Sequence, residues 1–257
     1  LAPILRAAFE QLPELTEAGA GKTWERSDEF LQTLLGEDPN ASVEALKDAL
    51  REGASPVQLA RTVTYAAALR VARFHVQNEF SDWLVVLHTF SYLNALHQLM
   101  KRNDSPDLLR GVFHGAMRVY LDRFLNIPPA RLPSGNGKAG ESDASLDGFL
   151  DLLDHQQQTD EAGRLVYRYL KSGGEATSLY RILAESLVRE DAEFHSFQVL
   201  EAAIRQYGEL EDEEERRMVM VAAARYLAAH APTQREMLQT LQVALRLHRG
   251  EPVYEAE

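Results

Sequence analysis

Histidine and carboxylate side chains gather at two places in the sequence, in patterns that could hold a metal ion. His75 and Glu79 are four residues apart, and His88 follows after a short interval. Asp191 and His195 show the same four-residue spacing in the second half of the chain. On a helix, side chains four positions apart share one face, so each pair could bind one ion.

Brought together, these five side chains would form a set of nitrogen and oxygen ligands. Such a set suits iron, manganese or zinc better than calcium or a soft metal. A metal ion held there could polarise a substrate, activate water or bind dioxygen. We therefore expect a divalent metal ion as cofactor and a small molecule as substrate, and the leading hypothesis is a metal-dependent oxidoreductase.

Two other functions fit the same residues. The paired Glu-x-x-His motifs of di-metal helical bundles are absent, and so is His-Glu-x-x-His. The histidines could be structural, in a non-catalytic helical module that binds a redox protein. A histidine paired with a buried carboxylate could also act as an acid–base catalyst without a metal.

Three helices must position these side chains. Pro56 suits the first turn of a long helix, which we expect to run towards Glu79 and to carry His75 on its inward face. A break near Ser81 must follow if His75 and His88 are to act together, and the next helix then spans 82–102. In the second half, a helix over 176–207 would carry Asp191 and His195 on one face.

The whole chain has the apolar periodicity of helices, without an alternating strand pattern, so we expect an all-α fold. We expect one helical domain over 1–257, with a first half over 1–127 and a second half over 146–257. The segment 128–145 between them is rich in proline and glycine, which is typical of a loop.

A weak internal repeat relates the two halves. An offset of 120 residues aligns Leu50 with Leu170 and Gly53 with Gly173, and it places Phe74-His75 on Phe194-His195. A unit of short helix, glycine and long helix used twice would explain this match. We expect the two Phe-His pairs to lie at equivalent points of two long helices, facing each other.

Composition excludes several classes of function. The net charge of −12 argues against binding to nucleic acid or to an anionic membrane surface. The chain has no cysteine, which excludes disulfides, thiol catalysis and a cysteine-ligated iron–sulfur cluster. Apolar runs are too short for a membrane span, and the first residues do not resemble a signal peptide. We expect a cytoplasmic protein, and a homodimer stays open.

Two stretches resemble known families. Residues 49–56, leading into Ala66-Ala67-Ala68, resemble the helical repeat of the alkylhydroperoxidase/carboxymuconolactone-decarboxylase type, whose redox members use a Cys-x-x-Cys pair that this chain lacks. Residues 72–83 and 189–195 resemble the helical region of bacterial proteins linked to Rieske-type iron–sulfur modules. The second resemblance extends over about 45–230 and implies a redox setting with a redox protein as partner. The iron–sulfur cluster is not expected in this chain, because its cysteine ligands are missing.

Overall fold

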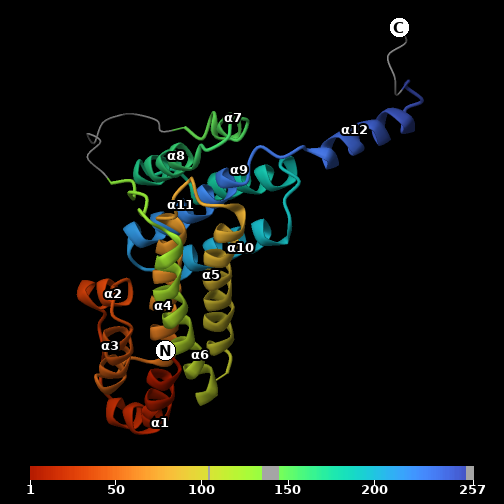
Figure 1. The fold of residues 1–257 in the computed structure, drawn as a ribbon. Helices are drawn as coiled ribbons and strands as arrows, with labels where there is room; N and C mark the ends of the chain where they lie inside the picture. Colours follow the sequence, from red (N-terminus) through yellow and green to blue (C-terminus); the bar gives the residue numbers. More distant parts are fainter. Residues whose placement is uncertain (104, 135–144, 253–257) are drawn as a thin grey trace.

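The computed structural model describes residues 1–103, 105–134 and 145–252, and every regular element in these ranges is helical (Figure 1). The expected all-α fold is therefore confirmed. In chain order the elements are α1 (Ala2–Gly19), α2 (Asp28–Leu34), α3 (Pro39–Arg51), α4 (Pro56–Ala72), α5 (Phe80–Met100), α6 (Pro106–Asp122), the short 3₁₀ helix η1 (Arg123–Leu125), α7 (Phe149–Leu152), α8 (Thr159–Lys171), α9 (Ala176–Arg189), α10 (Phe194–Glu209), α11 (Glu213–Ala229) and α12 (Glu236–His248).

Two helices rich in small side chains form the centre of the molecule. In α4, Ala66, Ala67 and Ala68 are fully buried, and in α11 the run 222–224, also three alanines, is fully buried. A helix that is apolar on all sides belongs in a core, and small side chains let two helix axes approach closely. The two helices pack against each other, with α5 and α6 beside α4 and α8 and α10 beside α11.

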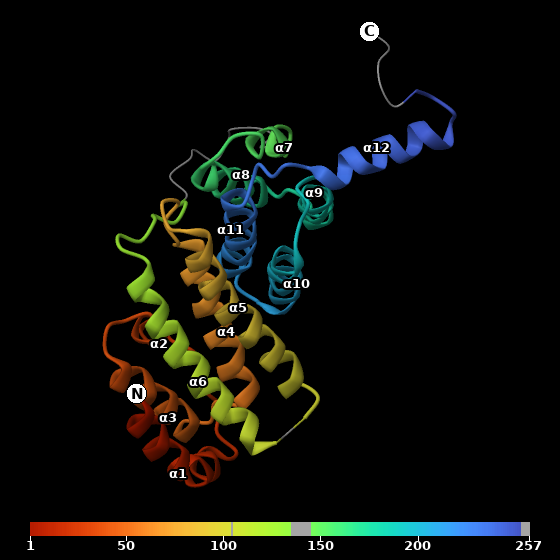
Figure 2. The ribbon, with the colours of Figure 1, turned by 45° about the vertical axis from the view of Figure 1, so that its right-hand side comes forward.

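The helices of the first half stand together at one end of the molecule. In both views α4, α5 and α6 lie side by side, with α1, α2 and α3 against them (Figures 1 and 2). Helices α7 to α11 gather at the other end, near the start of α5 and the end of α4. Within the described ranges, no helix has both the length and the apolar character needed to cross a lipid bilayer.

The segment that carries His75 is a turn, not a helix. The prediction of a helix reaching Glu79 was wrong, because α4 ends at Ala72 and α5 begins at Phe80. The Asn126 side chain hydrogen-bonds the backbone of this turn. Its Oδ1 accepts from the His75 N–H at 2.9 Å, and its Nδ2 donates to the Arg73 carbonyl at 2.8 Å. The expected break is confirmed, but it lies before Ser81.

A second break separates α9 from α10. The prediction of one helix over 176–207 was wrong, because residues 190–193 lie between two helices. Asp191 has a φ of 46°, in the left-handed region, which a continuous right-handed helix excludes. Asp191 and His195 therefore do not share one helix face.

A buried polar network fixes α5 against α10. Gln206 Nε2 donates to Asn94 Oδ1 at 2.9 Å and lies 3.1 Å from His97 Nδ1. The other His97 nitrogen, Nε2, lies 3.5 Å from a Glu209 oxygen, and Lys101 Nζ donates to Glu209 at 2.6 Å. Residues further along α5 contact residues further along α10, so the two helices run in the same direction.

The first helix of each helix–glycine–helix unit has the same bounds once the sequence is shifted by 120 residues. Helix α3 spans 39–51 and α8 spans 159–171, and each is followed by a glycine with positive φ, Gly53 and Gly173. The expected equivalence of the Phe-His pairs is wrong, since Phe74 is fully buried in a turn whereas Phe194 begins α10 and is 70 % exposed. Duplication of the halves stays a prediction, as does the division at 128–145, of which residues 135–144 lie outside the described ranges.

Helix α12 extends away from the other helices in both views (Figures 1 and 2). None of its residues is buried. Only its start is joined to the body, at the segment between α9 and α10 and at the end of α11. Thus α12 belongs to the chain's surface and adds nothing to its core.

Candidate functional site

Two of the five predicted side chains meet. The rings of His88 on α5 and His195 on α10 have centroids 5.0 Å apart, with their planes at 56°. His88 lies in the third turn of α5 and is exposed, while His195 is the second residue of α10. The parallel course of the two helices, fixed by the buried Gln206 network, brings these imidazoles together from distant parts of the sequence.

A carboxylate supports the second imidazole. Glu193 lies directly before α10 in an extended conformation, and its Oε1 is 3.1 Å from Nδ1 of His195. If Nδ1 carries the proton and donates to this carboxylate, the lone pair of Nε2 is left for a ligand or a proton. Burial lowers the pKa of His88, and the nearby His195 and Arg118 lower it further. The neutral form of the His88 ring is therefore favoured.

A small cavity lies close to the pair. It has a volume of about 80 Å³, and its lining includes Phe80, Glu193, Ser196 and His230. Burial lowers the pKa of His230, and the same cause raises the pKa of Tyr226. The charges of Glu193 and His195 both act on His230, so the cavity and the imidazole pair form one electrostatic environment.

Two polar atoms of neighbouring rings are buried without a hydrogen-bond partner among the described residues: Nε2 of His230, which lines the cavity, and the hydroxyl of Tyr226, whose ring packs on that of His230. The Nδ1 atom of His230 lies 2.6 Å from the Tyr226 carbonyl, so that side of the ring is already engaged. The His230 ring packs 4.1 Å from Tyr226 and 4.6 Å from Phe80, measured between centroids. Such unpaired atoms in an aromatic setting are where a small polar group could bind.

His75 and Glu79 do not join this centre. His75 is half-buried in the turn after α4, where its Nδ1 accepts from the Gln77 N–H at 3.3 Å. Glu79 is exposed and directly precedes α5, and its carbonyl accepts from Asp82 N at 3.0 Å. The prediction that the two share one helix face was wrong because the helix ends before them.

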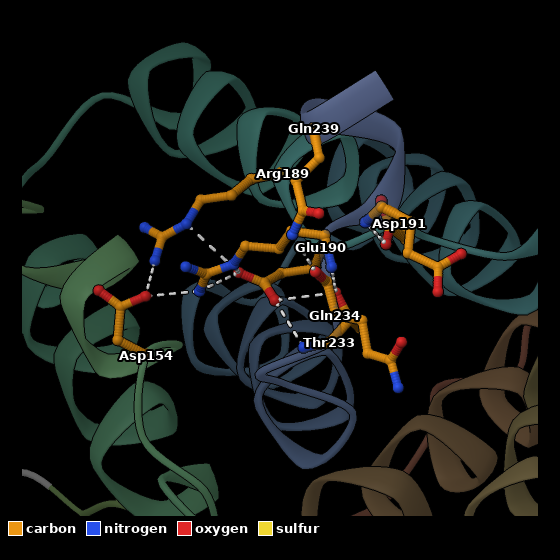
Figure 3. A network of polar contacts seen from close by, with 9 residues as sticks. Asp154, Arg189, Glu190, Asp191, Thr233, Gln234 and Gln239 are labelled. Atoms are coloured by element: carbon orange, nitrogen blue, oxygen red, sulfur yellow. Dashed lines mark hydrogen bonds and ion pairs between the residues drawn. The ribbon is translucent and has the colours of Figure 1, made fainter. Parts of the chain in front are cut away.

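Asp191 caps a different helix. Its carboxylate accepts from the backbone N–H groups of Glu236 and Met237, the latter at 3.0 Å, at the start of α12 (Figure 3). The network drawn around it joins Glu190, Arg235 and Asp154, with Arg235 Nη2 2.7 Å from Glu190 Oε1. Because both oxygens of Asp191 are used by α12, it is not available to the imidazole pair.

Sequence reasoning missed Glu193, Tyr226 and His230. Tyr226 and His230 have the four-residue spacing that drew attention to the other pairs, and both lie at the end of an apolar helix. Glu193 is one of three acidic residues in 190–193. Which acidic residue contacts His195 is set by the break between α9 and α10. At this break Glu193 lies beside His195, whereas Asp191 bonds the start of α12.

The arrangement offers imidazole–carboxylate chemistry. Among the described residues, no group of three or more His, Asp or Glu side chains is placed to hold a metal ion. The two imidazoles lie side by side, with Glu193 behind one of them. Comparison with protein-family models, with curated proteins and with solved structures gave no match, and the resemblances drawn from the sequence stay predictions.

Proposed function

We propose that the chain is an enzyme whose reaction centre is the pair His88 and His195, and that this pair holds a divalent iron, manganese or zinc ion for oxidoreductase chemistry. The observation that carries the proposal is the 5.0 Å approach of the two rings. Two imidazoles that became cationic together would repel each other, and a shared cation removes that conflict while keeping both rings neutral.

The ligand chemistry agrees with this proposal. Lowering of the His88 pKa by burial keeps its ring in the neutral form that binds metals. Glu193 near Nδ1 of His195 resembles the carboxylate–histidine arrangement that orients a metal ligand through its other nitrogen. In this proposal Glu193 orients His195 and does not itself bind the ion, and His75, Glu79 and Asp191 of the predicted set are not ligands. The ion would supply a Lewis acid or redox centre with positions open to substrate.

The neighbouring cavity would hold the substrate's polar group. The unpaired Nε2 of His230 and the hydroxyl of Tyr226 supply one exchangeable proton site and one donor. Burial lowers the pKa of His230 and so favours its neutral ring, which leaves Nε2 as a hydrogen-bond acceptor for a substrate group. Phe80 and Tyr226 pack against that ring and restrict its contact with water.

Metal analysis of protein purified without a histidine tag tests the proposal. We expect about one equivalent of iron, manganese or zinc per chain, either as purified or after loading of the chelator-treated protein. His88→Ala and His195→Ala should each lose the metal while circular dichroism shows unchanged helix content. His75→Ala is the matched control and should retain it, because His75 lies in the turn after α4. Failure of the wild-type protein to bind any of the three metals, or retention of the metal by both His88→Ala and His195→Ala, would contradict the proposal.

A further inference from the structure

Helix α12 presents an apolar stripe that nothing in the described chain covers. Met237, Leu241 and Leu245 are 59 %, 55 % and 44 % exposed, and Leu238 and Ala244 lie on the same face by their spacing. A stripe with three- and four-residue spacing is the face that a helix normally buries. Helix α12 therefore exposes the kind of apolar face that helices normally pack against a neighbour.

The direction of α12 is fixed at its start. Asp191 accepts two backbone N–H bonds from the first turn, and Arg235 binds both Glu190 and Asp154 (Figure 3). Both Asp191 and Arg235 have positive φ, at 46° and 54°, conformations that persist only where surrounding contacts impose them. Held in this way, α12 points away from its own chain and cannot fold back onto it.

The same chain carries a groove that fits such a helix. This α5–α10 groove is defined by Ser91 and Gln98 on α5, by Arg102 two residues after the end of α5, and by Phe194, Phe197 and Arg205 on α10, and it has a volume of about 410 Å³. Phe194 and Phe197 are 70 % and 51 % exposed. From Phe194 to Arg205 the groove extends about 16 Å along α10, and the 13 residues of α12 extend about 20 Å.

The helix and the groove form one continuous surface. Asp191, at the base of α12, lies three residues before Phe194, at the head of the groove.

We propose that α12 packs its apolar stripe into the α5–α10 groove of a second copy, and that the exchange is reciprocal and forms a dimer. Helix-in-groove contact through anchors spaced three and four residues apart is a recurrent mode of recognition. Specific interfaces bury roughly 1,200–2,000 Å² in total, and the two contacts of the dimer would have to supply this area together. The dimer covers Phe194, Phe197 and the stripe of α12 together.

Light scattering coupled to size-exclusion chromatography tests the exchange. Wild-type protein should have twice the 28.9 kDa mass of one chain, and Leu241→Glu and Phe197→Glu should each lower the dimer's affinity at least 100-fold. The controls are Gln239→Glu, on the opposite face of α12, and Phe124→Glu, a similarly exposed phenylalanine in η1; both should remain dimers. An equal mixture of Leu241→Glu and Phe197→Glu chains should recover part of the dimer, since the mixed pair retains one intact contact.

Disulfide trapping separates this exchange from other pairings, because the chain has no cysteine of its own. A mixture of Leu241→Cys and Phe197→Cys chains should form a cross-linked species of doubled mass, and it should form faster than with either variant alone. Cross-linking of Leu241→Cys alone at the same rate would indicate pairing of two α12 helices and overturn the proposal. A monomeric wild-type protein at 100 μM would overturn it as well.

Discussion

The guanidinium of Arg225 on α11 donates a hydrogen bond to the carbonyl oxygen of Phe74 at 2.9 Å, across 151 residues of sequence. Arg225 is 1 % exposed, and it also forms an ion pair with Asp160 at the start of α8. A single buried cation thus joins α11, α8 and the turn that carries His75. The two halves of the chain are tied at this point by charge as well as by apolar packing.

Replacement of Arg225 by methionine should destabilise the protein by about 2–3 kcal/mol, because the Phe74 carbonyl loses its partner and the Asp160 carboxylate loses its cation. Urea unfolding followed by circular dichroism measures this change. Arg164→Met is the matched control on α8, since Arg164 and Glu161 form an exposed pair worth roughly 0.5 kcal/mol or less. Equal losses in the two variants would show that burial of Arg225 has no special role.

Asp122 should make the protein more stable at acidic pH. Burial raises the pKa of this carboxyl from 3.8 to about 6, and the Thr89 hydroxyl and the cations Arg118 and Arg70 reduce the shift. The folded chain then binds more protons than the unfolded chain between about pH 4 and 6, so this group's contribution to stability falls as pH rises through that window. Asp122→Asn should raise the free energy of unfolding at pH 7 by about 1–3 kcal/mol.

The measurement is the urea midpoint at pH 4.5 and at pH 7 for wild type and Asp122→Asn. The variant's advantage should be largest at pH 7 and nearly absent at pH 4.5, where the wild-type carboxyl is protonated in the folded state. Asp107→Asn, at the exposed start of the same helix, serves as control. An advantage that does not change with pH would refute the assignment to ionisation.

Titration of His230 should make the protein less stable at acidic pH, the opposite of the effect of Asp122. Burial lowers its pKa below 6.5, so the unfolded chain binds more protons as pH falls below 6.5 and this contribution to stability is lost. His230→Phe keeps an aromatic ring against Phe80 and Tyr226 and removes the titrating nitrogen. Thermal unfolding should therefore show a smaller loss of melting temperature between pH 7.5 and 5.5 in His230→Phe than in wild type. His155→Phe, at an exposed position, should behave as wild type does.

Asp191 should control the order of α12. Asp191→Ala removes the acceptor of two N–H groups at the first turn, which is worth about 1 kcal/mol of helix stability. Amide hydrogen exchange in 236–242 should become several-fold faster, and the melting temperature of the rest of the chain should change little. Asp191→Asn should restore most of the protection, because asparagine caps helices as well as aspartate does. Unchanged exchange in Asp191→Ala would show that the caps do not hold the helix.

The sequence was sufficient for the helical class and for part of the candidate site. The start of α4 at Pro56 was predicted, although its end was not, and His88 and His195 were both in the predicted ligand set. The breaks at 73–79 and 190–193 were misplaced or missed, because tertiary partners decide them: Asn126 holds the first, and Asp191 turns away to cap α12. Local spacing cannot show such partners, so the carboxylate that supports His195 was assigned to Asp191 and not to Glu193.

The buried amide and imidazole contacts between α5 and α10 act as a pivot for the paired rings. His97 lies nine residues beyond His88 along α5, about 14 Å away along the helix axis. At that lever length, a tilt of α10 by about 4° displaces its upper end by about 1 Å. Mutations at Gln206 or Asn94 would therefore tune the separation of the two rings from a distance, without altering either ring or its immediate neighbours.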